Sequence, residues 1–327
     1  MAGATVPIQR AFIMVGLVLT AVLCDRDGIS MRLVAWAATA ILLLRPESLL
    51  GASFQLSFAA VIALIAAYEF LKAHELSPER AVIWRRPLRY LGGVALTTII
   101  ATLATSPFAI YHFNQMAQFG LIANILAVPL TAIWIMPFAV LSFILMPFGI
   151  ADFGLVPMGW GVNAIIDVAA WIASWKGAVL TVPAMPVAAL ITNGLGGLWL
   201  SLLQQRWRIA GGAAIAMGLS ALFFYSVPDI VVDEKGKLFA IQGSEGTLHL
   251  SSKRVSKFAG KIWLRRVGQQ SEIGQKWPKQ DFSDDKSLSC DRLGCIYRQK
   301  GHKIALITDR QAVPEDCQTA DIVVMNT

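Results

Sequence analysis

Charged residues are scarce in this sequence. Only 15% of its 327 residues are Asp, Glu, Lys or Arg, compared with about 25% in an average soluble domain. The scarcity is confined to residues 1–228, which hold 12 basic and 8 acidic residues, whereas residues 229–327 hold 16 and 13. The composition therefore predicts a long apolar part, 1–228, followed by a short part of ordinary soluble composition, 229–327.

Two features of other protein classes are also missing. No Gly-x-x-x-x-Gly-Lys-Ser/Thr sequence occurs in the chain, so we expect no ATP site. Residues 1–5 lack a basic residue and Arg10 comes only just before an apolar run, which is unlike a secretory signal. The abrupt start predicts a piece of a longer protein.

Uncharged apolar runs make up most of residues 1–228. From Gly51 to Tyr68 no residue carries a charge, and a helix of this length spans most of a hydrocarbon core of roughly 30 Å. Similar runs predict a polytopic α-helical membrane bundle. Its eight expected segments are 10–24, 33–44, 51–71, 91–111, 119–146, 156–175, 186–203 and 207–226.

The fifth of these segments is too long for one simple helix. Pro129 and Pro137 lie inside it and predict a short helix near 115–127 followed by a spanning helix. A broken helix is often where a pore or transporter places its site, and a packing kink is an equally good alternative.

The charge of one loop sets the expected orientation. Residues 72–89 carry five basic and two acidic residues, which places this loop in the cytoplasm under the positive-inside rule. Counting segments forward from there, the eighth ends on the outer side of the inner membrane. Residues 229–327 are therefore expected to be extracytoplasmic, which means periplasmic in a bacterium with two membranes.

Residues 229–327 alternate short β-like runs with turn sequences. This pattern predicts a small mainly-β domain with some helix. The expected strands are 230–232, 237–242, 247–250, 295–298, 303–308 and 321–325, and the expected helix is 258–266.

Three cysteines lie in the same part. Cys290 and Cys295 are separated by four residues that include a Gly, and in an oxidising compartment this spacing predicts a disulfide. The alternative is a metal site that also uses Cys317, for which no fourth ligand is near in the sequence.

An ordered set of motifs resembles the ComEC family of competence proteins. The resemblance covers nearly the whole chain, and the family usually has Gly where this chain has Ser53. The matching pieces are Arg10 to Met14, Pro46 with Phe54-Gln55-Leu56-Ser57-Phe58, Pro107 with His112-Phe113, Asn124 to Pro129, Trp263 to Arg265, Cys290 to Cys295 and Ala320 to Val324.

The resemblance implies an inner-membrane channel for uptake of single-stranded DNA during natural transformation. The implied partners are single-stranded DNA, the lipid bilayer, a cytoplasmic motor and periplasmic DNA-binding competence proteins, and a homo-oligomer is left open. It also implies that the family's N-terminal soluble domain is absent from this fragment and that the C-terminal domain is cut short.

Many family members end in a metallo-β-lactamase-like nuclease domain. Such a site needs a His-x-His-x-Asp-His cluster, but residues 229–327 contain only His249 and His302, far apart in sequence. We expect both to be solvated surface histidines. The domain is therefore predicted to be a degenerate version without metal, cofactor or enzymatic activity.

A channel for single-stranded DNA needs polar groups along a wet path and basic or aromatic groups at its mouth. The alternatives are hydrogen bonds between helices for the polar residues and a solvated helix face for the basic ones. The candidates for the path are Gln55, Ser57, His112, Asn114, Gln115, Gln118 and Asn124. The candidates for DNA contact are Lys253, Arg254, Lys257, Lys261, Arg265 and Arg266, around Phe258 and Trp263.

Asp167 is a carboxylate within an apolar segment. We expect it to be protonated and bonded to a neighbouring helix such as the one with Asn193. Two other functions are weighed against the channel: a secondary transporter of a small polar solute, and a membrane-anchored periplasmic nuclease.

Overall fold

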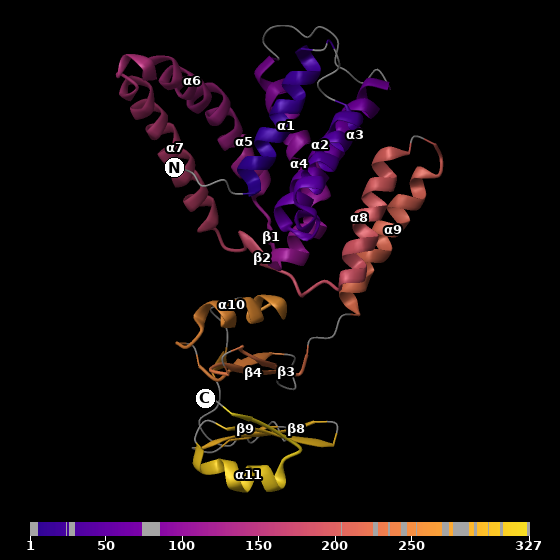
Figure 1. Ribbon diagram of the computed structural model, residues 1–327, viewed down its shortest axis with the longest axis vertical. Coiled ribbons are helices and arrows are strands. Elements are labelled where there is room, and N and C mark those ends of the chain that lie inside the picture. The colour runs from indigo at the N-terminus through magenta and orange to yellow at the C-terminus, as the bar shows by residue number, and fades with distance from the viewer. Residues whose placement is uncertain are drawn as a thin grey trace. The chain divides into compact units, whose positions relative to one another are not determined.

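The computed structural model of the chain forms two compact units (Figure 1). The first comprises Met1–His112, Met116–Leu180 and Val187–Ala221, and the second comprises Phe113–Gln115, Thr181–Pro186 and Leu222–Thr327. The structure describes residues 6–23, 25, 30–73, 86–203, 205–224, 228–234, 236–242, 247–252, 254–269, 275–276, 288–290, 293–299, 301–307 and 310–325.

Helices make up the first unit. In chain order they are α1 (Val6–Leu23), α2 (Met31–Leu44), the 3-10 turn η1 (Pro46–Leu50), α3 (Ala52–Ala73), α4 (Arg86–Phe113), α5 (Gly120–Leu130), the π-helical turn η3 (Thr131–Ile135), α6 (Met136–Leu145), the 3-10 turn η4 (Met146–Phe148), α7 (Asp152–Ala173), α8 (Val187–Leu202), α9 (Arg208–Ser220) and the 3-10 turn η5 (Ala221–Phe223). Each predicted membrane segment lies over one of these helices or, for the fifth, over α5 to α6.

Four helical spans are long and apolar enough to cross a bilayer. They are Ala52–Ala73, Arg89–Phe113, Gly120–Phe148 and Asp152–Ala173. The helices Met31–Leu44 and Val187–Leu202 are apolar but shorter. Because few of their side chains are buried within the chain, the apolar surfaces of these helices suit a lipid environment.

The predicted short helix near 115–127 is present only from Gly120 onward. Gln115–Ala117 is strand β1, which pairs with β2 (Val179–Thr181), and the helix begins only at Gly120. Pro129 and Pro137 do not divide it either. The N–H of Met136 donates to the carbonyl of Thr131, five residues back, so a π-helical turn absorbs the interruption and the span continues.

The aromatic residues of the Phe54–Phe58 motif belong to the interior of the bundle. Phe54 and Phe58 are buried against Ala37 and Ile41 of α2, and their ring centroids lie 4.2 Å apart. These rings fix the rotation of α3 against α2, and Gln55 is therefore held at a defined position beside them.

The second unit is built from two four-stranded sheets. The first has the order β3-β4-β5-β6 and the second the order β10-β9-β8-β7. The strands are β3 (Ile230–Val232), β4 (Phe239–Gln242), β5 (Leu248–Leu250), β6 (Gln275–Lys276), β7 (Leu288–Cys290), β8 (Gly294–Gln299), β9 (His302–Ile307) and β10 (Ile322–Met325).

These sheets stack between two helices, α10 (Lys257–Arg266) and α11 (Val313–Thr319), in the order helix, sheet, sheet, helix (Figure 1). Phe239 and Ile241 of the first sheet pack against Tyr297 and Leu306 of the second. On the outer faces, Leu264 of α10 joins the cluster of Ala240, Leu248 and Leu250, and Ala312 beside α11 joins Ala305 and Ile307. The alternation of inward and outward residues along each strand produces these three apolar layers.

The predicted strands and the predicted helix 258–266 are present, but α11, β6 and β7 were missed. The sequence did hold a signal for α11, because Pro314 lies at its first turn together with Glu315 and Asp316, residues that favour a helix N-terminus. As a result β10 is parallel to β9, with α11 as the crossover between them.

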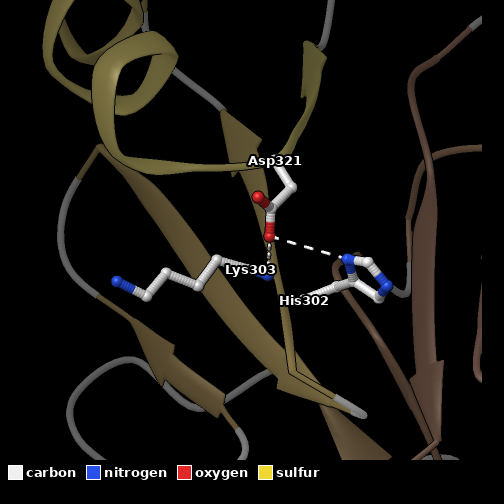
Figure 2. A network of polar contacts seen from close by, with 3 residues as sticks. All are labelled: His302, Lys303 and Asp321. Atoms are coloured by element: carbon white, nitrogen blue, oxygen red, sulfur yellow. Dashed lines mark hydrogen bonds and ion pairs between the residues drawn. The ribbon is translucent and has the colours of Figure 1, made fainter.

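Asp321 binds the start of β10 to β9 through two hydrogen bonds with Lys303 (Figure 2). Its Oδ2 accepts from the N–H of Lys303 at 2.8 Å, and its own N–H donates to the Lys303 carbonyl at 2.8 Å. The Nδ1 of His302 lies 3.7 Å from the same carboxylate oxygen. Since His302 is 72% exposed, the prediction that this histidine is solvated is confirmed.

Candidate functional sites

A polar contact joins two of the helices that carry the motifs. The Oε1 of Gln55, in the first turn of α3, lies 2.8 Å from the Nε2 of His112, in the last turn of α4. The Nε2 of Gln55 donates to the carbonyl of Leu49 at 3.0 Å. Because the amide nitrogen of Gln55 faces Leu49, its oxygen faces His112. An amide oxygen can only accept a hydrogen bond, so the Nε2 of His112 is the donor and carries the ring proton.

The other path candidates do not gather around this pair. Ser57 is half-buried on α3 and Asn114 is buried directly after α4, whereas Gln118 and Asn124 are exposed and Gln115 begins β1. Among the residues that the structure describes, no hydrogen bond joins Asn124 to Gln55 or His112. Sequence reasoning therefore named Gln55 and His112 as candidates but did not predict their contact, which is the hydrogen bond between helices that was weighed as the alternative.

Asn114 ends α4 through its backbone. Its φ is +53°, the left-handed conformation that Asn tolerates better than other side chains with a Cβ. Its carbonyl accepts from the N–H of Val182 at 3.0 Å, and its buried Nδ2 has no hydrogen-bond partner among the described residues. The residue is thus placed mainly by the turn it makes.

We expect Asn114→Val to lower the free energy of unfolding by about 1–3 kcal/mol, because a β-branched residue is strained at positive φ. Asn114→Gly is the matched variant and should lose less, because Gly adopts this conformation without strain. Thermal unfolding of the purified chain in detergent measures both. Equal losses for Val and Gly would show that the side-chain amide matters rather than the turn.

The expectation for Asp167 is contradicted. Its side chain is exposed on α7, and it has no hydrogen bond or ion pair among the described residues. Asn193, on the helix that was expected to bind Asp167, is instead buried on α8. Its Nδ2 donates to the carbonyl of Ala189 at 2.7 Å. This intrahelical bond uses the Nδ2 of Asn193, while its buried Oδ1 has no hydrogen-bond partner among the described residues.

The basic candidates gather on α10 and the turn before it. Arg254, Lys257, Lys261 and Arg266 are exposed and Arg265 is half-buried, whereas Lys253 lies outside the described residues. Phe258 is 80% exposed. Trp263 does not belong to this outward face, because it packs against the cluster around Leu264 on the sheet side.

The end of α10 is attached to the segment that connects α7 with α8. The N–H of Ala184 donates to the carbonyl of Arg266 at 2.9 Å, and the Oγ1 of Thr181 donates to the carbonyl of Gly268 at 2.8 Å. Pro183 lies against Gly268, whose φ of +81° suits Gly alone. Sequence reasoning missed this attachment, since nothing in residues 181–186 marks it.

His249 corrects a second expectation, because it is buried rather than solvated. Only 9% of it is exposed, on β5, where its Nε2 lies 3.3 Å from the Oγ1 of Thr247. Across the part of the chain that the structure describes, no three His, Cys, Asp or Glu residues are grouped as they would be to hold a metal ion.

The three cysteines of residues 229–327 lie on β7, β8 and α11. Cys295 is disulfide-bonded, and Cys290 stands opposite it in the β7–β8 ladder. The side chain of Cys290 lies outside the described residues, so its pairing with Cys295 stays a prediction. Cys317 is a free, exposed thiol on α11.

Comparison with known proteins identifies the family. The model of the family described as Competence protein matches residues 1–207. A curated relative, the ComE operon protein 3 of Bacillus subtilis (strain 168), is 29% identical over 143 residues, which are 44% of this chain and 17% of that protein. The matched part thus spans less than a fifth of the relative's length, and no solved structure matches. With more than half of its length under the family model, and with helices able to span a membrane, this chain belongs to the Competence protein family of membrane proteins.

Proposed function

We propose that this chain forms part of an inner-membrane channel that carries single-stranded DNA into the cytoplasm during natural transformation. It acts as a passive conduit, and a cytoplasmic motor supplies the pulling force. Family membership supports a role in competence, and the four long apolar helices support a place in the membrane. Periplasmic DNA-binding competence proteins deliver the strand in this proposal.

The contact between Gln55 and His112 is the observation that carries the proposal. Both residues come from stretches that resemble ComEC motifs, and they meet across 57 positions of sequence at 2.8 Å. Polar groups inside a membrane face the bundle interior or a wet cavity rather than lipid. Amide and imidazole groups bring no negative charge, so they suit a path for a chain of phosphates.

In this proposal the second unit is a degenerate metallo-β-lactamase-like domain on the periplasmic side. The helix, sheet, sheet, helix order of its layers supports the assignment. Its orientation rests on the basic loop after α3, whose residues 74–85 lie outside the described residues. We assign no hydrolytic step to it.

A secondary transporter of a small polar solute is the second candidate function. The exposed Asp167 on α7 favours it, because intramembrane carboxylates are typical of ion and proton pathways. Asp167→Asn would abolish coupled transport while a passive DNA channel would tolerate it.

Deletion of the gene for the full-length protein tests the main proposal. We expect transformation with linear DNA to be lost and to return when the full gene is supplied again, while DNA delivered by electroporation still recombines. Normal transformation by the deletion strain would overturn the channel. Loss of recombination after electroporation would place the defect after uptake, and it would contradict the channel equally.

A further inference from the structure

The outward face of α10 combines a row of cations with an exposed aromatic ring. Lys257, Lys261 and Arg265 follow each other at four-residue spacing, so they lie in one row along the helix. Phe258 and Ile262 form the neighbouring row, and Phe258 is 80% exposed. This is the pattern of a helix that lies in a membrane interface.

The opposite face of α10 cannot take part, because the sheet below covers it. Gly260 and Leu264 are buried, and a Cβ on Gly260 would lie 3.3 Å from a methyl group of Leu250. The sheet therefore fixes the rotation of the helix and keeps the cationic row and Phe258 directed outward. The 10 residues of α10 present a convex rod rather than a groove.

The sequence segment that contains α10 carries charge of one sign, although the carboxylate of Asp233, from another segment, accepts from the Ser256 hydroxyl directly before the helix. Residues 247–271 contain six basic residues and no acidic residue. Lys257 and Lys261 are exposed, and they have no ion pair among the described residues. The positive charge of this face therefore favours an anionic partner surface.

Chain connectivity brings such a surface within reach. Ala184, which binds Arg266 at the end of α10, precedes Val187, the first residue of the apolar helix α8, by three positions. Three residues span at most about 10 Å. A short linker therefore joins the residue that binds the end of α10 to the first residue of an apolar helix.

We propose that the outward face of α10 rests on anionic lipid headgroups, with Lys257, Lys261 and Arg265 on phosphates and Phe258 between the lipids. The contact seats the second unit on the membrane surface. Single-stranded DNA, the partner expected from the sequence, suits this face less well, because its binding proteins combine the aromatic platform with a groove that follows the backbone.

A fluorescent label at the helix tests the contact in the full chain. Phe258→Cys is labelled with bimane in a background of Cys24→Ser and Cys317→Ser, under non-reducing conditions. The protein is placed in nanodiscs of phosphatidylcholine alone or mixed with phosphatidylglycerol, with a trace of lipid that carries a nitroxide quencher on its headgroup. The same serine background with Phe258 retained, taken through the same labelling reaction, gives the background signal.

We expect strong quenching in the anionic nanodiscs and weak quenching in the neutral ones. The variant Lys257→Gln/Lys261→Gln should lower the ratio of bound to free helix by about 25-fold, since each cation near an anionic surface contributes about fivefold. Half-molar salt should reduce quenching in the same direction.

The matched control removes two exposed cations from the second sheet. Arg298 and Lys303 face each other across β8 and β9, and Arg298→Gln/Lys303→Gln should leave the quenching unchanged. Equal losses in both double variants would overturn the proposal, as would equal quenching in neutral and anionic nanodiscs. If a single-stranded oligonucleotide protects the label from iodide while lipid never quenches it, the face binds DNA and the lipid contact is refuted.

Discussion

Transformation should fall at least about tenfold when Gln55 is replaced by Leu. The substitution removes the acceptor of His112 Nε2–H and the donor to the Leu49 carbonyl together. Gln55 and His112 are half-buried, so we take the cost of the unsatisfied polar groups at the lower end of about 1–3 kcal/mol, and about 1.4 kcal/mol corresponds to a factor of ten. Transformation frequency with linear DNA measures the effect, and immunoblots of membranes normalise it to protein amount.

A charged variant separates a path residue from a purely structural one. Gln55→Glu keeps an oxygen acceptor toward His112 and places a carboxylate where the path is proposed. If DNA passes this pair, the added negative charge repels phosphates, and we expect the Glu variant to fold with more stability than Leu yet to transform no better. Recovery of transformation in the Glu variant would mean that the pair only holds α3 to α4.

The helix that carries His112 offers a matched control. Thr97 of α4 donates its hydroxyl within its own helix, to the carbonyls of Gly93 and Val94. Thr97→Val therefore removes a polar group without breaking a contact between helices, and it should change transformation by no more than about twofold. In the double variant Gln55→Leu/His112→Leu the losses should be less than additive, because both changes remove one shared interaction.

The helices of the first unit were predictable because a long uncharged apolar run, such as the one in α3, forms a helix when it lies in a membrane. The contact between Gln55 and His112 was not, although both residues were candidates. Their meeting depends on the rotation of α3, which is set by Phe54 and Phe58 against α2. Such rotation is a property of packing and leaves no periodic pattern in the sequence.

Other differences have local physical causes. The local pattern favours helix where strand β1 lies, but Gln115–Ala117 pairs with Val179–Thr181, more than 60 residues away, and tertiary pairing overrides local propensity. The burial of His249 was not predictable, because a lone histidine carries no sign of it in the sequence. The basic character of α10 was visible in the sequence. Its attachment was not, because the backbone N–H of Ala184 and the hydroxyl of Thr181 donate to backbone carbonyls and leave no pattern in the sequence.

Gly211→Ala should be among the most damaging single substitutions in the first unit. A Cβ at this position would lie 2.6 Å from the carbonyl oxygen of Gly196 and 2.8 Å from the backbone nitrogen of Leu200. Both are backbone atoms of α8 and cannot move aside like a flexible side chain, so α8 and α9 must separate. We expect the free energy of unfolding to fall by about 1–3 kcal/mol. The substitution would also remove the close helix packing that small residues provide in membranes.

The neighbouring glycine supplies the control. A Cβ on Gly212 would meet nothing within 4 Å, so Gly212→Ala should be neutral or stabilise α9 by up to about 1 kcal/mol through its higher helix propensity. Gly196→Ala and Gly197→Ala form a second pair on α8 with the same contrast, since only the Cβ at 196 would contact α9. Thermal unfolding of the full chain in detergent ranks all four variants. If Gly211→Ala and Gly212→Ala unfold at the same temperature, α8 and α9 do not pack through these glycines, and the close pairing of the two helices is refuted.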